Sequence, residues 1–342
     1  EWGQLRRLDM ASNRLGSVAS AVESLADLVG RLPALTELNV TANFIRAAGA
    51  TALTTALLSR TQQDGGSLKT LLLGRNSIGC AGLVALKSAL LGPLTSLERL
   101  NLEENDIRDT GATALADCLG VLTNLHELSL RKNPLGAVGG IAILDGLSHR
   151  FTTGTTETTR FRKMHTFDVS QCNLQGAAAE KAVAGAMRTL PNLIQLSIQG
   201  NLLGNEGCPH LCNALYANAT ANACLTRLSL GGINLGRVGA ELLTFPLALL
   251  TSLSHLGLGR NSLGDTGLLT LLPVLTTLGH LRTLALQHND FGPTCSPAIV
   301  HLIMSLPSLH DVVLYGNNLH LGPQGIRPLQ RCRHIITWDT DI

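Results

Sequence analysis

The stretch LERLNLEENDIRDTG, residues 97–111, decides the fold of this chain of 342 residues. Leucines occupy its first, fourth and sixth positions, an asparagine the ninth and a glycine the fifteenth. The alternation at its start predicts a short strand, and the pattern ALADCLGVL that follows predicts a helix. The stretch therefore predicts one strand followed by one helix.

The same frame recurs eleven times along the chain, at intervals of about 28 residues. Its first positions are Leu5, Leu35, Leu68, Leu97, Leu125, Met164, Leu193, Leu225, Leu253, Leu281 and Leu309. Because stacked repeats share one continuous core, we expect a single domain over residues 1–342, with positions one, four and six inside.

Position nine is asparagine in nine of the repeats, and we expect its amide to bond backbone groups of the loop and form a ladder. These residues are Asn13, Asn43, Asn76, Asn105, Asn133, Asn201, Asn261, Asn289 and Asn317. Cys172 and Ile233 depart from the pattern. The glycines at position fifteen, such as Gly111 and Gly139, predict a close approach of the helix layer to the strand layer.

The two kinds of element differ in width, so the stack must curve. Neighbouring strands lie about 4.8 Å apart, whereas packed helices need about 10 Å. The predicted fold class is therefore an α/β solenoid with a parallel sheet on its concave side and helices on its convex side.

This arrangement resembles the leucine-rich repeat family, in particular its ribonuclease-inhibitor-like class with long helical repeats. The resemblance covers residues 5–319 and implies a horseshoe that binds proteins by its concave face or its rims. Similar members are ribonuclease inhibitor, the activator of the GTPase Ran, sensor domains of innate immune receptors, and subunits of cytoskeletal and axonemal assemblies.

Composition narrows the classes of partner. Lys and Arg number 26 against 24 Asp and Glu, which favours neither nucleic acid nor a membrane surface. The eight cysteines follow no regular spacing, which is typical of reduced, buried thiols. We expect a C-terminal cap over residues 320–342 and, since no capping segment precedes Leu5, a truncated N-terminus.

Positions two, three, five, seven and eight are expected to face the concave side. Repeats three to five place there the candidate partner-binding residues Arg75, Arg99, Glu103, Glu104, Arg131 and Lys132. One interpretation is a set of cross-strand pairs on a solvated sheet, and the other is a charged recognition patch. Repeats seven to nine carry glycines there, such as Gly200 and Gly232, and are expected to leave that face bare.

The longest insertion, HRFTTGTTETTRFRK at residues 149–163, is expected on one rim between a helix and the next strand. It carries a formal charge of +3, from four basic residues against Glu157. It is either a tolerated surface insertion or a basic arm that binds an acidic partner. Its candidate contact residues are Arg150, Phe151, Arg160, Phe161, Arg162 and Lys163.

The sequence offers little evidence for a metal site or a catalytic site. Cys208, His210 and Cys212 have a spacing that suggests zinc, but Cys208 and Cys212 also fit two small core residues on one helix. The chain contains no phosphate-binding glycine loop followed by Lys-Ser or Lys-Thr, and no nucleophile elbow. We therefore predict no catalytic residue, no metal and no cofactor.

The sequence favours a non-catalytic interaction or scaffold protein in the cytoplasm, a structural subunit of a larger assembly, cytoskeletal or axonemal by analogy with the family. One alternative is a GTPase activator resembling the Ran activator, although the strongly acidic C-terminal tail of that family is missing. Another is the ligand-sensing domain of an innate immune receptor, which would require a nucleotide-binding module upstream.

Overall fold

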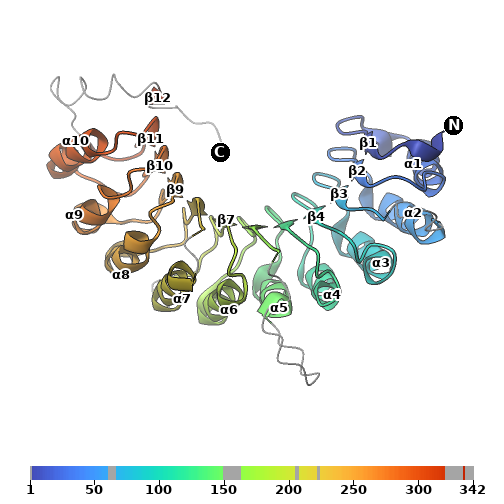
Figure 1. Ribbon diagram of the computed structural model, residues 1–342, viewed down its shortest axis with the longest axis horizontal. Coiled ribbons are helices and arrows are strands. Elements are labelled where there is room, and N and C mark those ends of the chain that lie inside the picture. Colours follow the sequence, from blue (N-terminus) through green and yellow to red (C-terminus); the bar gives the residue numbers. More distant parts are fainter. Residues whose placement is uncertain are drawn as a thin grey trace. The chain divides into compact units, whose positions relative to one another are not determined.

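The chain folds into two compact units, Glu1–Leu174 and Gln175–Ile342, called here the N-terminal and C-terminal units. In each unit a layer of parallel strands lies along the inner side of a curve and a layer of helices along the outer side (Figure 1). The computed structural model describes residues 2–60, 67–148, 163–204, 208–221, 224–319 and 334–335. That the repeats form a single domain stays a prediction.

The N-terminal unit alternates short strands with helices. Its strands are β1 (Arg7–Asp9), β2 (Glu37–Asn39), β3 (Thr70–Leu72), β4 (Arg99–Asn101), β5 (Glu127–Ser129) and β6 (Thr166–Asp168). Its helices are α1 (Ala19–Gly30), α2 (Arg46–Ser59), α3 (Gly79–Leu91), α4 (Asp109–Leu119) and α5 (Gly136–Ser148), with 3-10 turns at Trp2–Gln4 and Leu15–Ser17. The strands pair in chain order, all parallel.

The C-terminal unit has the same alternation. Its strands are β7 (Gln195–Ser197), β8 (Arg227–Ser229), β9 (His255–Gly257), β10 (Thr283–Ala285), β11 (Asp311–Val313) and β12 (His334–Ile335). Its helices are α6 (Gly176–Thr189), α7 (Cys208–Ala221), α8 (Gly236–Leu249), α9 (Gly264–Leu275) and α10 (Ser296–Ser305), with a 3-10 turn at Pro293–Cys295. Strands β7 to β12 are also parallel and in chain order.

The repeat frame predicted from the sequence is confirmed by the strands. Each of β1 to β11 begins two residues after a predicted first position, as β4 begins at Arg99 after Leu97. β12 lies within the predicted cap, and the rest of that cap, residues 320–333 and 336–342, lies outside the described residues.

The core is built from the predicted leucine positions. Leu97 and Leu102 are fully buried, and Leu100 between them is 2% exposed. The register places the fourth positions side by side, with Leu71 next to Leu100 and Leu100 next to Leu128. Burying an aliphatic side chain of this size contributes about 1.5–3 kcal/mol, so these rows stabilise the strand layer against the helices.

The asparagine ladder also forms as predicted. The Oδ1 atom of Asn105 accepts a hydrogen bond from the backbone N–H of Asn76 at 3.1 Å, and Asn105 N–H donates to Asn133 Oδ1 at 3.0 Å. The Asn105 amide also donates to the Leu73 and Leu102 carbonyls, at 2.9 and 3.0 Å. Since these groups are buried, the ladder supplies bonds that water cannot.

The backbone at position eight is left-handed in all eleven repeats, which the sequence analysis did not foresee. Its φ is +58° at Arg75, +52° at Glu104 and +54° at Lys132. Gly200 and Gly232, interpreted from the sequence as leaving a bare face, occupy this same position with φ of +69° and +62°. Glycine is favoured there because it takes this conformation without steric cost.

The glycines at position fifteen allow a close approach, but between different layers from those predicted. A Cβ at Gly139 on α5 would lie 2.8 Å from both Ala112 Cβ and Asp109 Cα, which belong to α4. The prediction of helix–strand contact was wrong here, because the missing Cβ makes room for the neighbouring helix.

Candidate protein-binding surface

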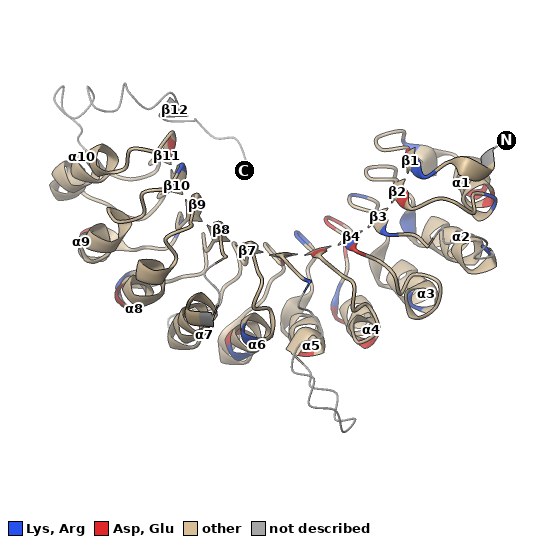
Figure 2. Cartoon of the chain, viewed as in Figure 1, with Lys and Arg blue, Asp and Glu red and all other residues tan. Residues whose placement is uncertain are grey.

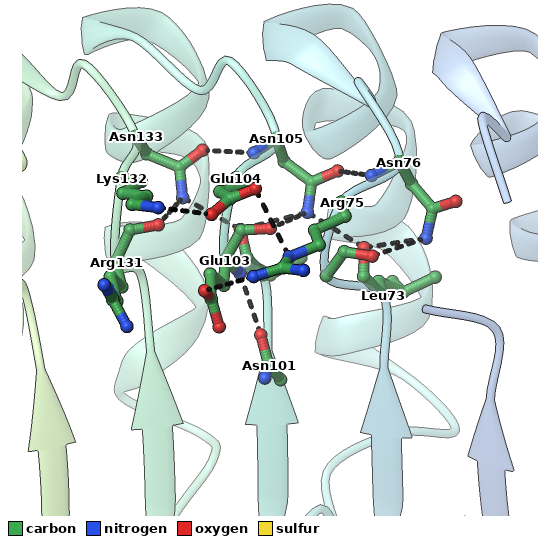
Figure 3. Close-up of polar contacts among 12 residues, drawn as sticks. Leu73, Arg75, Asn76, Asn101, Glu103, Glu104, Asn105, Arg131, Lys132 and Asn133 are labelled. Carbon is green, nitrogen blue, oxygen red and sulfur yellow. Dashed lines mark hydrogen bonds and ion pairs between the residues drawn. The ribbon is translucent and has the colours of Figure 1, made fainter. Parts of the chain in front are cut away.

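Acidic and basic residues both occur along β1 to β5 and the loops after them in the N-terminal unit (Figure 2). We call Arg75, Arg99, Glu103, Glu104, Glu127 and Lys132 the charged strip. The left-handed backbone at position eight presents Arg75, Glu104 and Lys132 from three consecutive loops. Figure 3 shows Glu104 between the other two.

Glu104 binds a cation on each side. Its Oε1 atom lies 2.9 Å from Lys132 Nζ, and its Oε2 atom lies 3.3 Å from Arg75 Nε. Arg75 also approaches Glu103, with 3.7 Å between Nη2 and Oε1 (Figure 3). The hydrogen bond from Lys132 and the charge of Arg75 lower the pKa of Glu104. The carboxylate is therefore ionised at neutral pH and compensated within the protein.

Pairs also form directly across the strands. Arg99 and Glu127 are register partners on β4 and β5, and Arg99 Nε lies 2.9 Å from Glu127 Oε2. Lys69 Nζ lies 2.9 Å from Glu98 Oε1 just before β3 and β4, and this hydrogen bond lowers the pKa of Glu98. Exposed pairs of this kind contribute roughly 0–1 kcal/mol each.

The structure thus brings five of the candidate residues together in the charged strip: Arg75, Arg99, Glu103, Glu104 and Lys132. Arg131 is half-buried and makes no ion pair within 4.0 Å in the described part of the chain. That these residues bind a partner stays a prediction. The contacts show that the interpretation as cross-strand pairs accounts for most of their charges.

The insertion falls largely outside the part of the chain that the structure describes. Arg150, Phe151, Arg160, Phe161 and Arg162 lie outside the described residues. Lys163, where the description resumes, donates from Nζ to Asn124 Oδ1 at 2.7 Å. This bond holds the last residue of the insertion against the turn before β5.

The C-terminal unit has a second polar surface that the sequence analysis missed. A hollow near the start of β8 to β11 is called here the basic hollow, and it is lined by Arg227, His255, Arg282, Thr283, Pro307, Ser308, His310 and Asp311. Its charged residues stand at positions two and three of repeats eight to eleven in the sequence.

The cysteines at the suggested zinc spacing are core residues on α7. Cys208 is 3% exposed and Cys212 is 4% exposed, whereas His210 is exposed. Burial raises the pKa of Cys208 to about 11 and that of Cys212 to about 12, so both thiols are protonated at neutral pH. Within the described ranges no three His, Cys, Asp or Glu side chains are grouped to hold a metal ion.

Two comparisons with known proteins support the identification of the repeat. A family model described as the leucine-rich repeat matches residues 94–116 and 121–144. An internalin (inlF) from Listeria monocytogenes shares the fold at a TM-score of 0.54 and 20% identity, over 98% of this chain and 88% of that one. This chain contains leucine-rich repeats and has the fold that they form.

Two further comparisons add little to this identification. The leucine-rich repeat-containing protein LegL7 from Legionella pneumophila is 17% identical with a TM-score of 0.48, over 95% of this chain and 97% of that one. At that score the similarity does not establish a shared fold. No match was found among curated proteins. None of the described helices of this leucine-rich repeat protein has the length and hydrophobicity needed to cross a membrane.

Proposed function

We propose that this leucine-rich repeat protein is a non-catalytic interaction module and a structural subunit of a larger cytoplasmic assembly of the cytoskeletal or axonemal kind. Leucine-rich repeat proteins generally mediate protein–protein interaction. The observation that carries the proposal is that successive strands present side chains at equivalent positions. Arg99 on β4 and Glu127 on β5 are one such neighbouring pair. Such an array, repeating at about 4.8 Å, presents a partner with a regular polar surface.

The charged strip would set the orientation of the bound partner and would contribute little to its affinity. Its carboxylates already bind Arg75, Arg99 and Lys132, so a partner must compete with pairs that exist in the free protein. Charges at the edge of an interface mainly set association rate and register. Affinity would then come from contacts outside the strip.

The rim that carries residues 149–163 is proposed as the second contact. Its support is the sequence, since a long basic insertion on a rigid scaffold is a frequent carrier of function. The bond from Lys163 to Asn124 gives the insertion a fixed end on the N-terminal unit.

We also propose membership of the ribonuclease-inhibitor-like class and a single domain over all eleven repeats. Helices α1 to α10 have 10 to 14 residues each, which supports a class with long helical repeats.

The test is affinity capture with cross-linking mass spectrometry on the full chain and on a variant lacking residues 152–159. We expect one partner of a stable complex to cross-link to Lys163 or Lys69, with a several-fold loss in the deletion variant. A variant lacking residues 61–66, a shorter insertion before β3, is the matched control.

Capture of a GTPase through Lys132, unaffected by the deletion and followed by faster GTP hydrolysis, would replace this proposal with the GTPase-activator alternative. Failure of the full chain to retain any partner would refute the interaction module itself.

A further inference from the structure

The basic hollow differs from the charged strip in one respect: among the residues that the structure describes, its arginines have no acidic partner. Position three is Arg227 on β8, His255 on β9, Thr283 on β10 and Asp311 on β11, and these four are register partners across the unit. At the same position of the N-terminal unit, Arg7 faces Glu37 and Arg99 faces Glu127. Arg227 instead faces a histidine.

Neither arginine of the basic hollow forms an ion pair with a described residue. Arg227 and Arg282 are exposed, and neither lies within 4.0 Å of a carboxylate in the part of the chain that the structure describes. Asp311 is the acidic residue lining the hollow, and the Thr283 hydroxyl lies 3.5 Å from its Oδ2 atom. The lining therefore carries two guanidinium groups against one carboxylate.

His255 lines the basic hollow together with the two arginines. Partial burial lowers its pKa, the charges of Arg227 and then Arg282 lower it further, and Asp311 opposes them. Its Nδ1 atom lies 2.8 Å from the Ser254 hydroxyl oxygen. The imidazole thus lies close enough to both arginines to feel their charges, and a bound anion there would favour its protonation.

The surroundings can bind oxygen atoms of a ligand. Ser254 and Thr226 line the continuation of the hollow, beside Ser252 and His280. Planar guanidinium groups match the geometry of a carboxylate with two parallel hydrogen bonds. Two guanidinium groups against the Asp311 carboxylate leave an excess of one positive charge, which a single ligand carboxylate balances.

We propose that the basic hollow of Arg227, His255 and Arg282 is a docking site for an acidic segment of a partner protein, whose Asp or Glu carboxylate binds between the two arginines. This rests on the proposed function as an interaction module. It goes beyond that function by naming the chemistry of the partner and by placing it on the C-terminal unit, away from the residues chosen from the sequence.

The test uses the full chain and a fluorescent peptide of alternating Glu and Ser residues, with the Gln–Ser peptide as its neutral match. Binding is followed by fluorescence anisotropy, and the titration of His255 by NMR of its imidazole Cε1–H group. We expect binding of the Glu peptide alone, weaker as salt rises from 50 to 300 mM. The His255 pKa should rise in its presence, so binding should weaken as pH rises through that pKa.

The double variant R227A/R282A should bind the Glu peptide at least tenfold more weakly, as expected when two charged contacts are lost. R188A removes an exposed arginine from the last turn of α6 and should leave binding unchanged. Unaltered binding in the double variant, or an unmoved His255 pKa, would overturn the proposal. Competition by inorganic phosphate at lower concentration than by glutamate would also overturn it, in favour of a phosphate site.

The two proposals fail in different ways. A partner captured equally well by wild type and R227A/R282A would leave the interaction module standing and refute the basic hollow. Wild type that binds the Glu peptide through Arg227 and Arg282 but retains no partner would refute the module and leave the chemistry of the hollow intact.

Discussion

The Glu104 carboxylate lies 2.9 Å from the Lys132 ammonium group, although the two residues belong to successive repeats 28 positions apart. Both residues have left-handed backbone at the same turn of their loops, so the contact depends on the stacking of one loop on the next. With Arg75 on the other side, this contact links three repeats of the N-terminal unit.

The first prediction concerns this link. Replacing Glu104 by Gln removes the charge that Arg75 and Lys132 share and should lower the free energy of unfolding by about 0.5–1 kcal/mol, a modest effect because the pairs are partly exposed. Urea denaturation measures it. Asp106→Asn, two residues further on and exposed, is the matched control and should change stability by less than about 0.5 kcal/mol. An equal loss in both variants would contradict the role of the pairs.

The second prediction is the pH dependence of that contribution. The folded state lowers the pKa of Glu104 from 4.5, so its stabilisation is complete above that value and is lost as pH falls through the folded pKa. Stability measured from pH 6 downward should therefore fall less steeply in Glu104→Gln than in wild type. If the free energy of unfolding fell equally steeply with pH in the two proteins, Glu104 would have the same pKa in the folded and the unfolded state.

The third prediction concerns the ladder. Asn105→Ala leaves the buried N–H groups of Asn76 and Ile78 and the Leu73 carbonyl without the amide they bind. Each unsatisfied group costs about 1–3 kcal/mol, so we expect a loss of about 3–5 kcal/mol. Asn101→Ala in the same repeat removes one acceptor, bound by Glu103 N–H at 2.8 Å, and should cost about 1 kcal/mol. Similar losses in both variants would argue against the ladder as the main loop support.

The fourth prediction concerns helix packing. Gly139→Ala places a Cβ against Asp109 Cα and Ala112 Cβ of α4 and should destabilise the protein by about 1–3 kcal/mol through overpacking. Thermal unfolding followed by circular dichroism is the measurement. Gly279→Ala is the control, since a Cβ there meets nothing within 4 Å. A Gly139→Ala protein as stable as wild type would mean that the two helices separate without cost.

The fifth prediction concerns thiol reactivity. Cys80 is partly buried, which opposes ionisation, but hydrogen bonds from the Thr110 hydroxyl and the Arg108 N–H lower its pKa overall. Burial raises the pKa of Cys118 to about 11 and that of Cys172 to about 12. Iodoacetamide at pH 8 should therefore label Cys80 well before these two, as read by peptide mass spectrometry. Labelling of Cys172 at the same rate in the folded protein would be the contrary result, and Cys80→Ser identifies the early product.

Much of the fold could be read from spacing alone. The leucine positions predicted every strand from β1 to β11, because a buried strand needs apolar residues at alternate positions wherever the repeat recurs. The asparagines predicted their own hydrogen bonds, because a buried amide must bond and the turning loop offers unpaired backbone groups. The glycine at position fifteen was identified correctly as a point of close approach, but sequence spacing did not reveal which layer lies against it.

The candidate binding surfaces could be predicted from the sequence only in part. Opposite charges in adjacent repeats were visible in the sequence, but their mutual distances were not, so the sequence left open whether they form cross-strand pairs or a recognition patch. The basic hollow escaped notice because each repeat contributes only one or two unremarkable residues to it, among them Arg227 and His255.

The sequence by itself determined the repeat, its strands, its leucine core and its asparagine ladder, since these follow from the type and period of residues close together in the chain. Only the tertiary structure decided which charges neutralise each other. Arg99 meets Glu127 and is paired, whereas Arg227 meets His255 and has no ion pair with any residue in the described ranges. The physical reason is that an ion pair depends on distances of a few ångströms between residues about 28 positions apart, and only the stacking of repeats sets those distances.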